Sequence, residues 1–235
     1  MKKLVIIPAY NESLNLLSVI EDLKEHAKGY DYIIINDAST DGTKDVCETN
    51  GLHYLDLASN LGIGGAVQTG YQYALYEGYD IAVQIDGDGQ HEAASLLKLE
   101  KALLSEEQNA DMVIGSRFID KKGFQSTKLR RAAICWISFL IRILTGVKIT
   151  DPTSGFRMCR RSVIEIFADK YPWDYPEPES TTSLIVRGMK VIEIPVEMKA
   201  RQGGKSSLSN PFSALFYMIK VSLGIVIEVI GGKKK

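Results

Sequence analysis

Short apolar runs alternate with helix-like segments through the first half of this 235-residue chain. The predicted strands occupy residues 4–8, 32–36, 53–57, 81–85 and 112–115. The predicted helices occupy residues 12–28, 43–50, 63–77 and 93–106. Strands and helices in alternation are typical of a mostly parallel sheet that helices cover on both faces. We therefore expect an α/β fold, and a chain of this length can bury a substantial core.

Polar side chains follow four of these predicted strands. They are Tyr10, Asn11 and Glu12 after the first strand, Asp37 after the second, Asp86 and Asp88 after the fourth, and Arg117 after the fifth. In open parallel sheets, ligands bind beyond the carboxyl ends of the strands. The pattern therefore predicts a single binding site along this edge of the sheet.

The segment Asp86-Gly87-Asp88 indicates a divalent cation in that site. Residues i and i+2 of an extended backbone face the same side, so both carboxylates can converge on one point. Mg²⁺ or Mn²⁺ takes one or two carboxylates and leaves its other positions to substrate phosphates and water. The flanking glycines allow a diphosphate to approach the backbone. An Asp-Gly turn that closes a hairpin is the alternative interpretation.

The net charge of −1 conceals an asymmetry between the two halves of the chain. Residues 1–116 hold 7 Lys and Arg against 19 Asp and Glu, a net of −12, whereas residues 117–235 hold 21 against 10, a net of +11. An acidic half suits a metal site, and a basic half suits phosphates or an anionic membrane surface. Two differently charged solvated faces would give the same numbers. Nucleic acid is disfavoured, because aromatic residues do not interleave with the basic ones.

The cysteines and the N-terminal residues of the chain indicate the cellular compartment. Cys47, Cys135 and Cys159 are scattered without the spacing of metal ligands, which favours reduced thiols in a cytosolic protein. The apolar run near the start ends at Pro8 and is too short for a signal peptide. We therefore expect the protein to work on the cytoplasmic side of a membrane or in the cytoplasm.

The second half is more basic and less regular. An apolar helix is predicted at residues 132–144, a loop of turn-forming residues at 151–157 and a strand at 191–196. Between them, a proline-rich loop is expected around residues 172–178. The glycine-containing cationic segment 201–207 is able to fold over a diphosphate, and an exposed turn is the alternative.

Glycines are concentrated at residues 62–65, just before the third predicted helix. Their spacing is not that of a dinucleotide-binding fingerprint. We interpret them as a place where the helix packs closely on its neighbours, with backbone amides near a phosphate as the less favoured alternative.

The tail, residues 211–230, is almost wholly apolar. Its ~20 residues at ~1.5 Å each approach the length that a bilayer requires. Lys220 and Glu228 interrupt it, and each charge costs ~2.5–3.5 kcal/mol at mid-membrane, which disfavours a spanning helix. We expect a helix that lies in the membrane interface or packs on a membrane partner or another subunit. A helix buried within the domain is the alternative.

Seven segments together resemble the family-two inverting glycosyltransferases, and among them the polyprenyl-phosphate sugar synthases that use dolichyl or undecaprenyl phosphate. The segments are residues 8–12, 36–42, 60–66, 86–91, 115–117, 154–157 and 201–206. The resemblance implies a GT-A (Rossmann-like) fold with apolar or amphipathic helices at the C-terminus. It implies a catalytic domain at 1–207, divided into a nucleotide- and metal-binding half at 1–116 and an acceptor half at 117–207. Residues 208–235 would be a membrane-associating or oligomerising tail.

The resemblance also implies roles for individual residues. The nucleotide-sugar would be bound by Pro8, Tyr10, Glu12, Asp37, Asp86 and Lys205. The metal, Mg²⁺ or Mn²⁺, would be held by Asp88 and Gln90 with Asp86. The acceptor phosphate would be bound by Arg130, Arg131, Ser154, Arg157 and Arg201. The catalytic residues would be Asp151, Arg117 and Arg131, with Arg130 as the neighbouring alternative to Arg131.

Three positions depart from the pattern of the family that the chain resembles. Asn36 and Ala38 stand where Asp and Gly are frequent, and Ile63 stands where a Lys is common. The first two weaken any inference about the nucleobase. The third removes one expected contact to phosphate.

The resulting hypothesis is an enzyme that transfers a hexose, with inversion, from a nucleotide-sugar to polyprenyl phosphate at the cytoplasmic face of a membrane. A UDP-sugar is the favoured donor, and a small membrane protein and a second copy of the chain are candidate partners. One alternative is transfer to a saccharide hydroxyl during polysaccharide synthesis, which would require Asp151 as a base. The other is a nucleotide-binding scaffold without catalysis.

Overall fold

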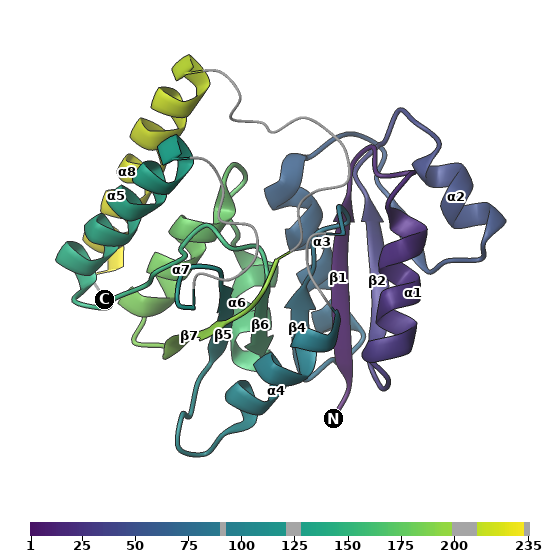
Figure 1. The fold of residues 1–235 in the computed structure, drawn as a ribbon, viewed down its shortest axis with the longest axis horizontal. Coiled ribbons are helices and arrows are strands. Elements are labelled where there is room, and N and C mark those ends of the chain that lie inside the picture. The colour runs from purple at the N-terminus through teal and green to yellow at the C-terminus, as the bar shows by residue number, and fades with distance from the viewer. Residues whose placement is uncertain (90–92, 121–127, 199–210, 233–235) are drawn as a thin grey trace.

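A single mixed sheet organises the molecule. The computed structural model describes residues 1–89, 93–120, 128–198 and 211–232, so the predicted site residues Gln90, Arg201 and Lys205 lie outside the described residues. In the described part, the strands are β1 (Lys3–Ala9), β2 (Asp31–Asn36), β3 (Tyr54–Asp56), β4 (Ile81–Gln84), β5 (Met112–Ser116), β6 (Arg157–Arg160) and β7 (Val191–Pro195). Their spatial order is β3-β2-β1-β4-β6-β5-β7 (Figure 1). Among the described strands, the pairings made by β6 are antiparallel and the others are parallel, so the predicted mostly parallel sheet is confirmed.

Side chains of the central strands alternate between two cores, one on each face of the sheet. In β1, Leu4 and Ile6 belong to one core, and Val5 and Ile7 belong to the other. This division follows from the pleat of a strand, in which successive side chains point to opposite faces. Because both faces are covered, the strand reads as a continuous apolar run instead of an alternating one.

The described helices cover both faces, as the alternation predicts. They are α1 (Leu16–His26), α2 (Thr43–Thr49), α3 (Gly62–Tyr76), α4 (Leu96–Leu104), α5 (Lys128–Thr145), α6 (Arg161–Asp169), α7 (Pro176–Val186) and α8 (Pro211–Gly232), and a short 3₁₀ turn precedes α4. Buried residues of α1, α2 and α4 join one core. Buried residues of α3, α5, α6, α7 and α8 join the other.

The loops predicted at residues 151–157 and around residues 172–178 are shorter than expected, and no strand or helix was predicted between them. A strand, β6, begins at Arg157, and two helices, α6 and α7, follow it. The proline-rich segment begins a helix because Pro176 occupies its first turn, where a missing N–H removes no intrahelical hydrogen bond. The predicted helix at residues 12–28 also begins later, at Leu16.

The interpretation of the glycines at residues 62–65 as a close-packing site is confirmed. A Cβ added to Gly64 would lie 2.1 Å from the Pro172 carbonyl oxygen, a separation that no side chain tolerates. The Gly64 N–H donates to the Trp173 carbonyl oxygen at 3.1 Å. The amino end of α3 is thereby fixed against the segment that leads into α7.

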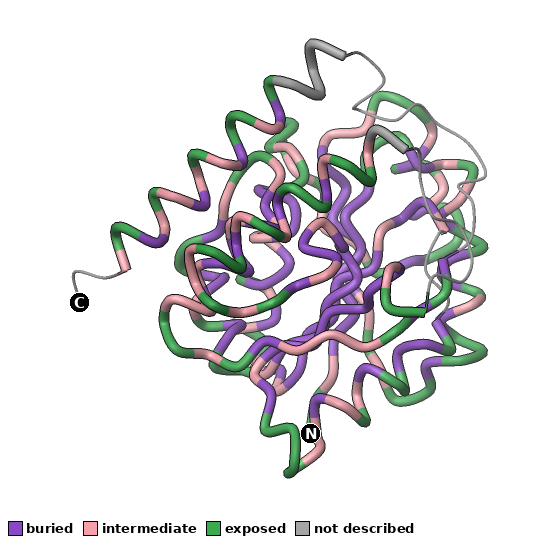
Figure 2. The backbone as a smooth tube through the Cα atoms, turned by 60° about the vertical axis from the view of Figure 1, so that its left-hand side comes forward, coloured by how far each residue is buried: buried purple, intermediate pink, exposed green. Residues whose placement is uncertain are grey.

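The C-terminal helix α8 has one face in the core and one face in solvent. Tyr217, Val221, Ile225 and Val229 are buried, whereas large apolar side chains at Phe216, Ile219, Leu223, Ile227 and Ile230 are exposed. Figure 2 shows this alternation along α8, and Figure 1 places α8 beside α5 at one flank of the sheet.

The two charges within α8 have partners in the same chain. Lys220 pairs with Asp174, and Glu228 pairs with Lys170 at 3.2 Å. Both charges therefore have ion-pair partners in the segment between α6 and α7. Among the described helices, none is both long enough and apolar enough to cross a membrane.

Candidate active site

The carboxyl ends of β1, β2 and β4 are neighbours in the sheet, and the residues that follow these strands lie along one edge. Tyr10 and Glu12 follow β1, Asp37 follows β2, and Asp86 and Asp88 follow β4. The sequence pattern placed these side chains at one site, and the sheet order brings the strands that carry them together.

The antiparallel strand β6 brings a further segment to this edge. Because β6 runs opposite to β4 and β5, its amino end lies where their carboxyl ends lie. The preceding residues therefore enter the site between β4 and β5. Two hydrogen bonds fix them there: the Ser154 hydroxyl donates to the Gly115 carbonyl at 2.7 Å, and the Gly115 N–H donates to the Phe156 carbonyl at 2.8 Å.

Asp37 is buried where β2 ends. Its Oδ1 atom accepts a hydrogen bond of 2.6 Å from the Leu61 N–H. Burial raises the pKa of the Asp37 carboxyl, and hydrogen bonds from the amides of Leu61 and Gly62 oppose that rise without cancelling it. The carboxylate is thus held in a fixed orientation between β2 and the amino end of α3. A carboxylate held in this way is suited to accept hydrogen bonds from a substrate.

The loop after β1 is tied to the loop after β2. Asn11 adopts a left-handed backbone with φ of +58°, and its Oδ1 atom accepts hydrogen bonds from the N–H groups of Thr40 and Asp41 at 2.8 and 3.2 Å. The Glu12 N–H donates to the Thr43 hydroxyl at 3.0 Å, and the Glu12 side chain is largely buried. Tyr10 beside them is half exposed.

Asp86 and Asp88 provide hard oxygen atoms that suit Mg²⁺ or Mn²⁺. Gly155 packs closely on Asp86, since a Cβ at this position would lie 3.0 Å from both carboxylate oxygens of Asp86. Gly87 likewise lies against the Pro8 carbonyl, 3.2 Å from where its Cβ would be. No group of three or more acidic, His or Cys ligands occurs among the described residues. Two carboxylates are the usual protein share when a diphosphate supplies further ligands, so the donor set fits such an ion.

Arg117 and Asp151 form a buried, two-pronged ion pair. Arg117 Nε lies 2.6 Å from Asp151 Oδ2, and Arg117 Nη2 lies 2.7 Å from Asp151 Oδ1. Burial disfavours the charge on Arg117, but the hydrogen bonds and the charge of Asp151 outweigh burial and hold the pKa of Arg117 above its ordinary value. Asp151 is completely buried, with both oxygens occupied by the guanidinium. The predicted base is therefore engaged as the orienting partner of Arg117.

Glu193, which was not among the predicted site residues, fixes the backbone at Asp151. Its carboxylate accepts hydrogen bonds from the N–H groups of Thr150 and Asp151 at 2.6 and 2.7 Å. Burial raises the pKa of Glu193, and these two amide hydrogen bonds oppose that rise. The sequence contains one signal that could have identified Glu193, because it is a charged residue within the otherwise apolar β7.

Arg157 occupies a different environment from the one predicted for a phosphate ligand. Its side chain is fully buried, and its guanidinium donates to the carbonyl oxygens of Ser154 and Glu177 and to the Ser180 hydroxyl. These contacts tie the loop before β6 to the first turn of α7. Arg157 is therefore not placed as an acceptor-phosphate ligand. It fixes the loop before β6 against the first turn of α7, and these two segments form one wall of the site. Ser154, another predicted ligand, is also buried, with its hydroxyl bound to Gly115.

Of the two neighbouring arginines at the start of α5, Arg130 is the more buried. Burial lowers the pKa of Arg130, and the positive charge of Arg117 lowers it further. Arg131 is exposed on the outer surface of α5. The geometry favours Arg130, the alternative in the sequence analysis, over Arg131.

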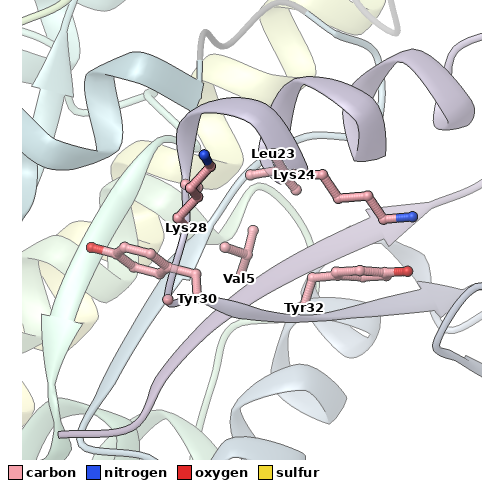
Figure 3. A pocket seen from close by; sticks show the side chains of 8 residues that line it. Val5, Leu23, Lys24, Lys28, Tyr30 and Tyr32 are labelled. Carbon is pink, nitrogen blue, oxygen red and sulfur yellow. The ribbon is translucent and has the colours of Figure 1, made fainter.

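A small pocket on the other side of the molecule contains none of the predicted site residues. It lies between the end of α1 and strands β1 and β2, with Leu23, Lys24, Lys28, Tyr30 and Tyr32 among its lining residues (Figure 3). Tyr30 donates a hydrogen bond of 2.7 Å to Glu100, so its hydroxyl already has a structural use. The pocket is separate from the candidate active site.

The fold defines the class of protein. Glucosyl-3-phosphoglycerate synthase from Mycobacterium tuberculosis, solved with Mn²⁺, UDP and phosphoglyceric acid, aligns with a TM-score of 0.71 over 98% of this chain and 78% of that one, at 19% identity. At that identity the likeness concerns the fold, which is that of GT-A glycosyltransferases. The chain itself belongs to glycosyl transferase family 2, which it matches over residues 4–167. The resemblance noted in the sequence is thereby confirmed, and the protein is a glycosyltransferase.

Three relatives match most of the chain. Undecaprenyl-phosphate mannosyltransferase from Micrococcus luteus is 31% identical over 89% of this chain and 88% of its own length. Polyprenol monophosphomannose synthase from Mycolicibacterium smegmatis is 30% identical over 89% of this chain and 82% of its own. A UDP-N-acetylglucosamine–dolichyl-phosphate N-acetylglucosaminyltransferase from Methanococcus voltae is 27% identical over 95% and 97%.

Proposed function

We propose that this glycosyltransferase moves a hexose, with inversion, from a nucleoside diphosphate sugar to a polyprenyl phosphate. The names of the relatives from Micrococcus, Mycolicibacterium and Methanococcus all include a polyprenol, undecaprenyl or dolichyl acceptor, which supports the acceptor class. A uridine-linked donor is favoured, since the Methanococcus relative is named for a UDP-sugar.

On the donor side, Asp37 and Glu12 would accept hydrogen bonds from the base or ribose, beside Tyr10. Asp86 and Asp88 would hold the divalent cation against the donor diphosphate. When bound, the cation offsets the charge that develops on the departing nucleoside diphosphate. The rigid loops after β1 and β2 position the donor, so the protein loses little entropy on binding it.

On the acceptor side, the observation that carries the proposal is the pairing of Asp151 with Arg117. A phosphate monoester has its second pKa near about 6 and is already largely ionised at neutral pH, so it can attack without a strong base. A sugar hydroxyl would need a free base, yet both Asp151 oxygens accept hydrogen bonds from Arg117. Arg117 and Arg130 would offset the repulsion between the anionic acceptor and the anionic donor.

The exposed apolar faces of α5 and α8 support a peripheral position on a lipid surface. Trp136 on α5 donates a hydrogen bond of 3.1 Å to Ser222 on α8, so the two faces are continuous. Phe139 and Ile143 extend the face on α5. An amphipathic surface with aromatic residues and flanking arginines suits the interface of a membrane with anionic lipids. We propose that residues 1–207 carry catalysis and that the tail 208–235 provides much of this contact, on the cytoplasmic face.

Transfer of radiolabelled sugar into butanol-extractable lipid tests the proposal. The purified protein would be incubated with undecaprenyl phosphate, Mn²⁺ or Mg²⁺, and UDP-glucose, UDP-N-acetylglucosamine or GDP-mannose in turn. We expect labelled lipid with at least one donor and none when EDTA is added. Label that enters a saccharide acceptor but never the lipid would contradict the proposal and favour the hydroxyl-acceptor alternative.

Asp151→Asn separates these two reactions further. If a phosphate attacks, the variant keeps measurable turnover, because the acceptor needs no base. If a hydroxyl attacks, the variant loses turnover altogether, and Arg131→Ala matters less.

A further inference from the structure

Gln84 is the last residue of β4 and lies two positions before Asp86. Its side chain is completely buried, whereas the other residues of this strand are apolar and the strand lies in the middle of the sheet. A buried amide in a central strand is unusual, because a polar atom that loses water without gaining a partner destabilises the fold. Packing alone therefore does not explain the presence of Gln84.

Only one of the two polar atoms of the Gln84 amide has a hydrogen-bond partner. Nε2 donates a hydrogen bond of 3.3 Å to Asp86 Oδ1, and because a carboxylate only accepts hydrogen bonds, the amide nitrogen must face Asp86. Oε1 is buried, and among the described residues no group donates to it. An apolar side chain of similar length would avoid this unpartnered acceptor. The amide thus lowers stability, and its hydrogen bond is directed at a predicted ligand of the donor-side cation.

Gly155 packs against the same carboxylate. A Cβ at Gly155 would lie 3.0 Å from both Asp86 carboxylate oxygens and 3.1 Å from Gln84 Nε2, so the three groups are packed together. This proximity follows from the pairing of β4 with β6, in which Gln84 lies opposite Arg157, two residues after Gly155. A hydrogen bond and a steric contact, which come from different segments of the chain, therefore both restrict the orientation of the Asp86 carboxylate.

We propose that Gln84 is a positioning residue of the donor site, whose amide orients the Asp86 carboxylate toward the divalent cation bound with the nucleoside diphosphate. This inference rests on the cation site of the proposed function and adds a residue behind it. Because Gln84 is completely buried, it acts through Asp86 and not on the donor itself. Residues that form hydrogen bonds to a metal ligand fix the orientation of that ligand, and their replacement typically weakens metal binding about 10–100-fold.

Calorimetric titration without turnover tests this role. UDP and GDP would each be titrated into the full-length protein, once with Mn²⁺ and once with EDTA, and the nucleotide that the wild type binds more tightly would be used for the variants. We expect Gln84→Met to lower the affinity measured with Mn²⁺ at least about tenfold. The affinity measured in EDTA should be unchanged, and so should the KM for the lipid phosphate in turnover assays.

Melting temperatures distinguish this role from a structural one. Met is unbranched, like Gln, and has no amide that needs partners, and Asp86 is partly exposed, so water can replace the lost hydrogen bond. The melting temperature of Gln84→Met should therefore be no lower than that of the wild type. Gln68→Met is the matched control, because Gln68 Nε2 donates to the carbonyl oxygens of Ala168 and Asp169 at 3.3 Å. It should lower the melting temperature and leave nucleotide binding unchanged.

Gly155→Ala perturbs the Asp86 carboxylate through a second contact. Gly155 is not among the residues with a positive φ, so its backbone accommodates alanine, but the added Cβ forces the carboxylate to shift. This variant should also bind the nucleotide more weakly with Mn²⁺ and equally well in EDTA. It decides the question if Gln84→Met does not fold.

The outcomes separate the two proposals. Unchanged binding with Mn²⁺ in a folded Gln84→Met variant, or an equal loss of affinity with Mn²⁺ and in EDTA, would overturn the role of Gln84 and leave the proposed function intact. A wild-type protein whose nucleotide binding is not tightened by Mn²⁺ would instead overturn the cation site of the proposed function, and the role of Gln84 with it.

Discussion

The donor side and the acceptor side of the candidate active site are built in different ways. The donor side consists of residues that directly follow the parallel strands β1, β2 and β4, with loops fixed by hydrogen bonds such as those of Asn11. The acceptor side gathers residues from the end of β5, from α5 and α7 and from the loop before β6, and its Arg117–Asp151 ion pair is buried. The comparison teaches that an edge of a sheet can be predicted from a strand pattern, whereas a site assembled from packed helices cannot.

The largest effect is expected on the donor side, at Asp88. Asp88→Asn keeps the shape but removes one of the two carboxylates that would hold the cation, so we expect lipid-linked product formation to fall by at least about a thousandfold. Initial rates at saturating Mn²⁺ measure this. Glu106→Gln, an exposed position after α4, is the control. If Asp88→Asn keeps full activity, the proposal that Asp88 binds a catalytic metal on the donor side is wrong.

On the acceptor side, loss of the buried Arg117–Asp151 ion pair should have a large effect on the free energy of unfolding. Arg117→Ala leaves the Asp151 carboxylate buried without its partner, which costs about 3–5 kcal/mol of unfolding free energy. Denaturant unfolding measures the loss. Arg161→Ala breaks the exposed pair with Glu165 and should cost no more than about 0.5 kcal/mol. Equal losses in the two variants would show that the buried pair has no special role.

Variants of Arg130 and Arg131 test which of the two arginines binds the acceptor phosphate. Arg130→Ala should raise the KM for the lipid phosphate about thirtyfold, as expected for the loss of a charged hydrogen-bond donor. Arg131→Ala should have a smaller effect, because Arg131 is exposed on the outer surface of α5. The reverse order of effects would restore Arg131 as the phosphate ligand that the sequence suggested.

The outer face of α8 should matter for lipid binding and not for folding. Leu223 and Ile227 are both exposed, so the double variant Leu223→Ser with Ile227→Ser removes apolar area without disturbing the core. Its binding constant for vesicles of anionic and neutral phospholipids should fall at least about tenfold. Its melting temperature should match that of the wild type. Unaltered vesicle binding would point to a protein partner or a second copy on this face.

The smallest effect is expected at Ala38, beside Asp37 on the donor side. Ala38 has a φ of +53°, a left-handed conformation that glycine adopts at lower cost. Ala38→Gly should therefore stabilise the protein by about 0.5 kcal/mol, since relief of strain exceeds the entropy that glycine loses on folding. Ala102→Gly, within α4, should instead destabilise it by about 1 kcal/mol. Chemical denaturation of both variants decides the sign.

Most of the first half could be predicted because its pattern is local. Strand and helix alternate there with few irregular residues, and the apolar runs of β1, β2 and β4 end at polar residues that mark the site. Residues 157–186 were harder, because β6 is short and carries Arg157 and Arg160 at its ends. The proline-rich segment has the composition of a loop, yet Pro176 occupies the first turn of α7.

The sequence by itself determined the family, the parallel strands of the sheet and the acidic pair at the end of β4, since each can be recognised from short segments of the chain. The tertiary structure decided which cations and carboxylates share an environment. Arg117 pairs with Asp151, Glu193 binds the backbone N–H of Asp151, and Arg157 is buried against the first turn of α7. These relations join segments 34 or more residues apart in most cases, as for Arg117 and Asp151. The pairing of β5 with β6 and β7 and the packing of α7 bring them within reach of one another.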